Sequence, residues 1–150
     1  MFKNYTAVLL REAIKALNKN EIPVSALAVH SGKIVAKAHN RTVKKQDKTA
    51  HAEMLLIKKL QKKFKTTHFF DINISVYITL EPCCMCVTAL AMCGVKNVFY
   101  MLEDEKFGGI NKVFVDTAYF KPNFYFVYND EYHKLLQNFF QKQRNTCTKA

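Results

Sequence analysis

Apolar residues recur with a helical period near the amino end of the chain, and the pattern then changes to the runs typical of strands. One helical face over residues 5–17 carries four apolar side chains: Val8, Leu9, Ile14 and Leu17. Two largely apolar runs follow, over residues 24–30 and 33–38, and Ser31-Gly32 separates them. This pattern predicts a helix followed directly by a β-hairpin.

Helices and strands alternate through the rest of the chain. Strands are expected over residues 73–80, 97–101 and 123–128, and helices over residues 49–64, 82–93 and from Asp130 through Phe140. Thr49 can cap the first of these helices, and Pro82 is tolerated in the first turn of the second. Because helices connect the last three strands, we expect an α/β fold whose five-stranded sheet is at least partly parallel.

Composition indicates one folded domain spanning residues 1–150. The chain has 150 residues, of which 49% are hydrophobic, and this is enough to bury a core. No repeat or low-complexity tract is visible, which argues against a solenoid, a fibre or a disordered chain. No apolar run reaches the length of about 18 residues that a membrane span requires, and no secretory signal is visible. We therefore expect a cytoplasmic protein with no membrane segment.

Charge and cysteine content point to particular partners. Lys and Arg number 23 against 12 Asp and Glu, so the net charge is +11, and many of the lysines are clustered. Such a surface is typical of nucleic-acid binding, although a solvated lysine-rich face is the alternative. Three of the five cysteines lie within residues 83–86, too close together for a disulfide framework. That spacing favours metal binding or redox chemistry.

Two short segments carry the candidate chemistry, His51-Ala52-Glu53 and residues 82–86. Cys83 and Cys86 are three residues apart at the start of a predicted helix, where exposed N–H groups favour the thiolate that binds metal. With His51 as a third ligand, the set suits Zn²⁺ and leaves one position open. An open position is typical of a catalytic zinc, which lowers the pKa of a bound water.

Glu53 would complete an enzyme site if its carboxylate approached that water and moved the proton. On a regular helix, however, a separation of two residues turns Glu53 about 200° from His51. A distorted first turn or an extended glutamate is therefore needed. Cys84 lies about 100° from Cys83 on the same helix and is expected to be a small buried residue that points away from the metal.

The pair H-x-E and P-C-x-x-C is the signature of the zinc deaminases that act on bases. Further segments resemble the bacterial tRNA-specific adenosine deaminases, of the cytidine/deoxycytidylate deaminase superfamily, in order and at similar spacing: residues 21–24, Asn40, residues 49–53, residues 79–86 and residues 135–140. The resemblance covers nearly the whole chain.

This resemblance implies a three-layer α/β/α fold of the cytidine deaminase type and conversion of the wobble adenosine of a tRNA to inosine. It also implies one Zn²⁺ per chain and a homodimer that binds the tRNA anticodon arm. The residues it assigns are His51, Cys83 and Cys86 as zinc ligands, Glu53 as proton shuttle, and Asn40, Phe139, Phe140 and Arg144 as substrate contacts. The chain departs from the family pattern at Ser25, Thr88, Gln141 and Gln143.

Two other functions remain open at this point. A deaminase of a free base or nucleoside, such as guanine, cytosine or cytidine, shares the same two motifs but needs no basic surface. A non-enzymatic RNA-binding module with structural zinc leaves Glu53 without a role. Asn40 is also a residue typical of turns, and Lys106 with Gly108-Gly109 fits either a nucleic-acid loop or a simple turn.

Overall fold

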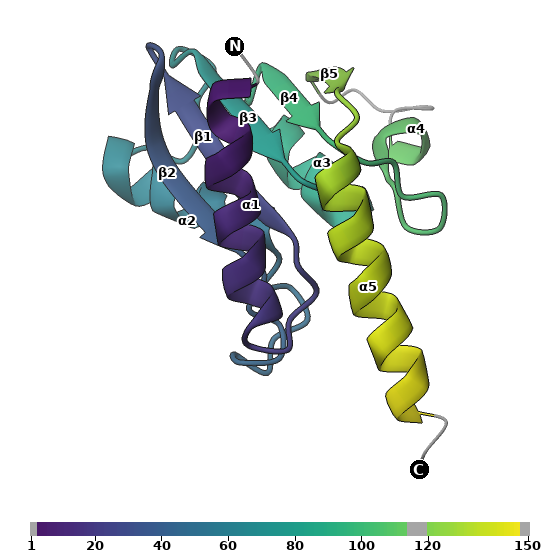
Figure 1. Cartoon of the computed structure of the whole chain (residues 1–150). Coiled ribbons are helices and arrows are strands. Elements are labelled where there is room, and N and C mark those ends of the chain that lie inside the picture. The colour runs from purple at the N-terminus through teal and green to yellow at the C-terminus, as the bar shows by residue number, and fades with distance from the viewer. Residues whose placement is uncertain (1–2, 114–119, 148–150) are drawn as a thin grey trace.

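A five-stranded mixed sheet forms the centre of the computed structural model, which describes residues 3–113 and 120–147 (Figure 1). The elements along the chain are α1 (Lys3–Leu17), β1 (Ser25–His30), β2 (Lys33–His39), α2 (Ala52–Phe64), β3 (Ile74–Ile78), α3 (Cys84–Met92), β4 (Asn97–Tyr100), α4 (Ile110–Val113), β5 (Asn123–Phe126) and α5 (Asp130–Cys147).

The strands lie in the order β2-β1-β3-β4-β5. β1 pairs antiparallel with both β2 and β3, whereas β3, β4 and β5 pair in parallel. Because β2 and β3 both run opposite to β1, their carboxyl ends meet at the same edge of the sheet. α2 follows β2 and α3 follows β3, so the sheet brings the beginnings of both helices to that edge.

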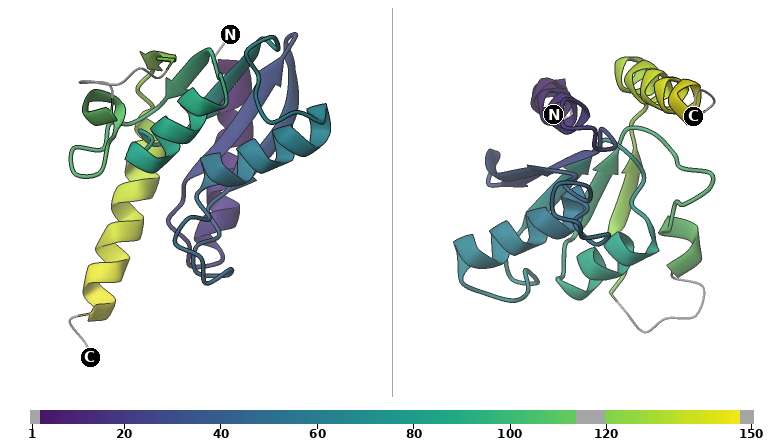
Figure 2. Two further views of the ribbon diagram at one scale, coloured as in Figure 1. Left: turned by 180° about the vertical axis from the view of Figure 1, so that it is seen from behind. Right: turned by 90° about the horizontal axis from the view of Figure 1, so that it is seen from below.

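Helices cover both faces of the sheet, which confirms the predicted three-layer α/β/α fold. α1 and α5 lie on one face, while α2 and α3 lie on the other (Figure 2). Apolar side chains fill both spaces: Leu9, Leu27, Tyr77 and Leu136 on the first side, and Leu56, Leu60, Val76 and Leu90 on the second. Among the described residues, no helix combines the length and the apolar character that crossing a bilayer requires.

Two predicted helix starts are wrong by two or three residues. Thr49 does not cap α2, because its N–H and hydroxyl both donate to Asp47 Oδ1 and the cap position belongs to His51. Pro82 precedes α3 rather than lying in its first turn, since Cys83 is the cap residue. Between residues 101 and 123, where the sequence pattern predicts no helix or strand, the structure contains the short α4; residues 114–119 lie outside the described residues.

A buried carboxylate joins α1 to the edge strand β2. Glu12 accepts hydrogen bonds from Lys15 Nζ at 2.7 Å, Lys37 Nζ at 3.2 Å and His39 Nδ1 at 3.1 Å. Burial acts to raise the pKa of Glu12, but the bonds from Lys15, His39 and Lys37 outweigh it and lower that pKa to about 2. The carboxylate therefore stays charged well into the acid range.

We expect Glu12→Gln to lower the free energy of unfolding by about 1.5–3 kcal/mol at neutral pH, because buried hydrogen bonds to a charged group are lost. A carboxyl whose pKa is lower in the folded state stabilises the fold above its unfolded pKa of 4.5, and this contribution disappears as the pH falls to about 2. Denaturant unfolding near pH 7 and near pH 3 should show the difference from wild type shrinking in acid. Glu105→Gln, at an exposed position, is the control; a difference that is as large near pH 3 would contradict this account.

Candidate active site and metal centre

The beginnings of α2 and α3 face one pocket at the edge where β2 and β3 end. His51 is the cap residue of α2 and has extended backbone angles, φ −68° and ψ 156°. Cys83 is the cap residue of α3 with similar angles, φ −70° and ψ 170°. Neither side chain caps its helix by a hydrogen bond, which leaves both free to point into the pocket.

Three potential metal ligands converge in this pocket. Nδ1 of His51 lies 3.7 Å from Sγ of Cys83 and 3.6 Å from Sγ of Cys86. All three donor atoms lie within 4.8 Å of one another. Ligand atoms placed tetrahedrally around zinc, at about 2.0–2.3 Å from the ion, are separated by about 3.5–3.8 Å. The positions and the donor types of this group therefore fit zinc, with the fourth position left for water or substrate.

Glu53 is buried beside these ligands. Its side chain is 3% exposed, and Oε2 has no hydrogen-bond partner among the described residues. His51 precedes the helix and has an extended backbone. The angle that separates two such positions on a regular helix therefore does not apply to His51 and Glu53, and both side chains can face the pocket. Burial raises the pKa of Glu53 to about 7, near the value that suits a group that takes and returns a proton at neutral pH.

The pKa values of the Cys83 and Cys86 thiols are shifted in opposite directions. Hydrogen bonding to Cys86 and His51 lowers the pKa of Cys83 to about 4, although burial acts in the other direction. The same contact with Cys83, together with burial, raises the pKa of Cys86. A second thiolate in this small volume requires a cation to offset its charge, so the thiol pair also fits a divalent metal ion.

The cavity over these residues has a volume of about 250 Å³, a size that suits a small ligand. Its walls combine apolar and polar side chains: Ile22, Val24, Asn40, Thr42, Lys48, Leu80, Glu81, Asp104 and Phe107. Oδ1 of Asn40 accepts a hydrogen bond from the N–H of Ala52 at 2.8 Å. The Asn40 side chain thus caps α2, although it lies 12 residues earlier in the sequence. No acceptor among the described residues pairs with its Nδ2 group, which can therefore donate to a ligand.

Two glutamates that were not singled out from the sequence hold the pocket walls. Glu21 is fully buried and accepts Oγ1–H of Thr42 at 3.1 Å and the N–H groups of Val43 at 3.1 Å and Lys44 at 2.9 Å. Glu81 accepts the N–H of Asp104 at 3.1 Å. Both residues fall in segments that resemble the family, but their partners lie more than 20 residues away and have no local sequence signal.

The loop after β4 passes closely over residues 82–84 at the start of α3. Gly109 donates its N–H to the carbonyl of Pro82 at 2.9 Å, and Gly108 forms a bridge with Cys83. A Cβ at Gly109 would lie 2.6 Å from the carbonyl carbon of Cys83. These glycines are thus required by packing. In the same loop, Asp104 Oδ1 accepts the N–H of Lys106, which closes a turn.

We expect Gly109→Ala to weaken zinc binding by about 10–100-fold, the range found when the support of a metal ligand is lost. The added methyl group must displace the backbone of Cys83, because no side chain fits at that distance. Competition with a chromophoric chelator measures the affinity. Gly32→Ala is the control, since its Cβ would meet nothing within 4 Å; its positive φ lowers stability but should leave zinc affinity unchanged. Equal zinc affinities in the two variants would refute the packing role of Gly109.

The remaining sequence-predicted residues lie outside this pocket. Cys84 is exposed, so the expectation of a buried residue is wrong; the helix begins after Cys83 and turns Cys84 outward. On α5, Phe139 is 7% exposed and Phe140 is 41% exposed, so Phe140 is the ring of this pair that an RNA can reach. Arg144 is on the exposed end of the same helix.

Two of the four departures from the family pattern, Ser25 and Thr88, make local hydrogen bonds. Ser25 is buried and donates its hydroxyl to the carbonyl of Leu9 at 2.7 Å, which joins β1 to α1. Thr88 donates its hydroxyl to the carbonyl of Cys84 at 2.8 Å, one turn earlier in α3. Gln141 and Gln143 are exposed on α5. None of the four is a member of the metal-ligand group.

Comparisons with known proteins agree with this geometry. A family model described as MafB19-like deaminase matches residues 3–144. The tRNA-specific adenosine deaminase of Aquifex aeolicus is 38% identical over 145 residues, 94% of this chain and 95% of that protein. A solved structure from studies of A-to-I editing by tRNA:A34 deaminases at the wobble position of transfer RNA has a TM-score of 0.77 at 29% identity, and the match covers 83% of this chain and 97% of that one.

A guanine deaminase from Bacillus subtilis is also similar, with a TM-score of 0.63 and 27% identity, and the match covers 95% of this chain and 93% of that one. All of these proteins are deaminases, which favours an enzyme over a non-enzymatic RNA-binding module. The family match and the Aquifex relative together show that this chain is a member of the MafB19-like deaminases and of the tRNA-specific adenosine deaminase family.

Proposed function

We propose that this chain converts adenosine to inosine at the wobble position of a tRNA by zinc-dependent hydrolysis. The observation that carries the proposal is the convergence of His51, Cys83 and Cys86 beside the buried carboxylate of Glu53. The similarity in sequence and fold to proteins named for tRNA adenosine deamination supports a tRNA as the substrate. The net charge of +11 agrees with an RNA substrate.

In this proposal, one Zn²⁺ per chain is held by His51, Cys83 and Cys86. When bound, zinc supplies Lewis acidity that lowers the pKa of water in the pocket toward about 7. Two thiolates and a neutral imidazole would balance the charge of the ion, and three protein ligands would leave one coordination position open.

Glu53 moves the protons of the reaction. Its carboxylate takes a proton from the attacking water and delivers it to N1 of the adenine ring. It then takes the second proton of that water from the oxygen now attached to C6 and passes it to the amine, which departs as ammonia. Asn40 orients the nucleotide with its Nδ2 donors, because its oxygen is already held by Ala52. Phe107 and Leu80 line the same cavity.

Outside the pocket, we propose that α5 contacts the anticodon arm through Phe140 and Arg144, while Phe139 packs α5 against the fold. We further propose that residues 1–150 act as one deaminase domain in the cytoplasm and form a homodimer. The resemblance to the family supports the dimer, and sedimentation velocity on the zinc-loaded protein tests it directly.

The substrate test compares a tRNA carrying adenosine at the wobble position with free adenine, guanine, cytosine and cytidine. We expect ammonia release and inosine formation with the tRNA only. The alternative of a free-base deaminase is favoured by the small cavity and the similarity to guanine deaminase. Turnover of a free base with the tRNA unchanged would select that alternative and overturn the proposed substrate.

A further inference from the structure

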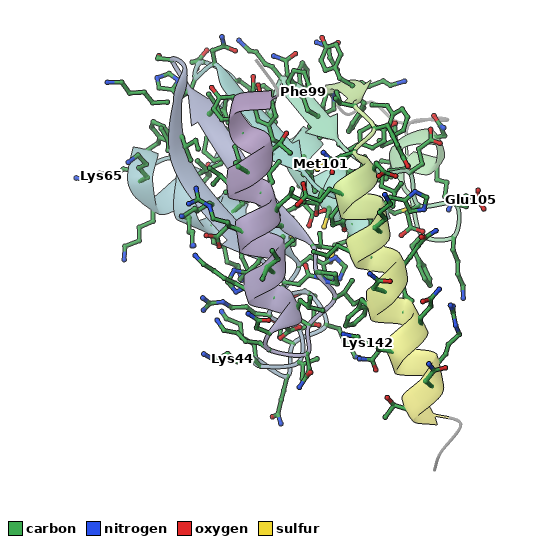
Figure 3. The ribbon with its side chains drawn as sticks, in the orientation of Figure 1. Lys44, Lys65, Phe99, Met101, Glu105 and Lys142 are labelled. Carbon is green, nitrogen blue, oxygen red and sulfur yellow. The ribbon has the colours of Figure 1, made fainter. Side chains whose placement is uncertain are left out.

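A strongly basic groove lies along the outer edge of the sheet, next to the pocket that holds Glu53 but distinct from it. Its volume is about 580 Å³, and α1, β2, the loop after β2 and α2 all contribute to its walls. Eight Lys and Arg side chains line it, among them Lys15, Lys19, Lys37, Arg41, Lys58 and Lys62. Figure 3 shows many nitrogen-tipped side chains around α1 and the neighbouring edge of the sheet.

The positive charge of this basic groove is largely unbalanced. Glu12 is the only acidic residue among the described ones that line the groove, and its oxygens already accept from Lys15, Lys37 and His39. Among the described residues, Lys19, Lys58 and Lys62 make no ion pair. Burial and the nearby Arg41 lower the pKa of Lys59, as expected where cations are crowded.

Protection of an edge strand does not explain the groove. Lysines on an edge strand discourage pairing with another chain, and this accounts for Lys37 on β2. The other cations come from α1, the turn after α1, the loop after β2 and α2, so the fold collects them from segments far apart in the sequence. A groove of this composition attracts a polyanion and concentrates it at the surface.

The basic groove and the catalytic pocket are neighbours but share no lining residue. At the end of β2, Asn40 lines the pocket, the next residue Arg41 lines the groove, and Thr42 lines the pocket again. A polynucleotide whose target base enters beside Asn40 therefore has the groove within reach of its flanking backbone.

We propose that the basic groove binds backbone phosphates of the tRNA and forms a docking surface separate from the base pocket and from α5. This inference rests on the proposed function for the identity of the RNA. Phosphate contacts of this kind position a nucleic acid without reading its sequence. They also make binding depend steeply on salt, because each neutralised phosphate releases counterions.

The test compares two triple variants that remove the same charge. Lys19→Gln/Lys58→Gln/Lys62→Gln removes three cations of the groove, and Lys33→Gln/Lys63→Gln/Lys65→Gln removes three exposed cations that do not line it. Binding of a labelled tRNA to the zinc-loaded proteins is measured over a range of salt concentrations. Zinc content and melting temperature should equal those of wild type in both variants.

We expect the groove variant to bind at least about tenfold more weakly near 0.1 M salt, with a log–log salt slope smaller by about 2–3, since each phosphate contact contributes about 0.7–0.9. The control should change the slope by less than about 1. Equal binding by the two variants, or no binding of tRNA by wild type, would overturn the proposal. Inosine formation by wild type is assayed in parallel, so a failure of the proposed reaction is visible separately from a failure of the groove.

Discussion

Glu53→Gln should lower the rate of deamination by about 10²–10⁴-fold, the contribution that a positioned general acid–base usually makes. The amide has nearly the same shape as the carboxyl, but it cannot take a proton from water or return one to the base. Because Glu53 is not among the three converging ligands, zinc content should stay at the wild-type level. Single-turnover rates with saturating enzyme measure the chemical step directly.

The control for this substitution is Glu105→Gln, an exposed carboxyl on the loop after β4 that points away from the fold (Figure 3). It should retain the wild-type rate. A Glu53→Gln enzyme with a near-normal rate would remove Glu53 from the mechanism. A large loss of zinc in this variant would show instead that the carboxylate supports the metal.

Cys86→Ser should abolish stable zinc binding, and with it the activity. Cys86 is completely buried and its Sγ lies 3.6 Å from Nδ1 of His51, so its thiol is a central member of the ligand group. A hydroxyl is a poor substitute because it does not ionise at neutral pH as a thiol does. We expect the affinity to fall by more than about 100-fold, beyond the range found for outer-shell partners.

Cys84→Ser is a matched control, since the same atom is exchanged two residues away at an exposed position of the same helix. Zinc per chain, measured by mass spectrometry under native conditions, should be one for wild type and Cys84→Ser and near zero for Cys86→Ser. Full zinc occupancy in Cys86→Ser would refute the ligand assignment.

Hydrophobic patterning was sufficient to predict the five strands and all helices except the short α4, because both faces of the sheet bury apolar side chains against helices. The helix starts were less predictable. Local sequence rules place a cap at Thr49, but the fold satisfies the first N–H of α2 with Asn40, 12 residues earlier. A cap that comes from another segment leaves no signal next to the helix it stabilises.

The convergence of His51, Cys83 and Cys86 could be predicted because metal coordination restricts residue type and spacing. The orientation of Glu53 and Cys84 could not, since both depend on where the helix begins: with His51 and Cys83 as extended cap residues, angles counted along a regular helix do not apply. The hydrogen bonds accepted by Glu21 and Glu81 join segments far apart in the sequence. The lysines of the basic groove also come from distant segments, so neither feature has a local sequence signal. Total charge was visible in the sequence, but its position was not.

The central claim is that this pocket hydrolyses the wobble adenosine of a tRNA. Its most direct test is incubation of the zinc-loaded protein with such a tRNA in ¹⁸O-labelled water, followed by mass analysis of the fragments. We predict inosine at the wobble position only, with one solvent oxygen in each inosine formed. A tRNA that remains unmodified at that position, or inosine without the label, would contradict the account.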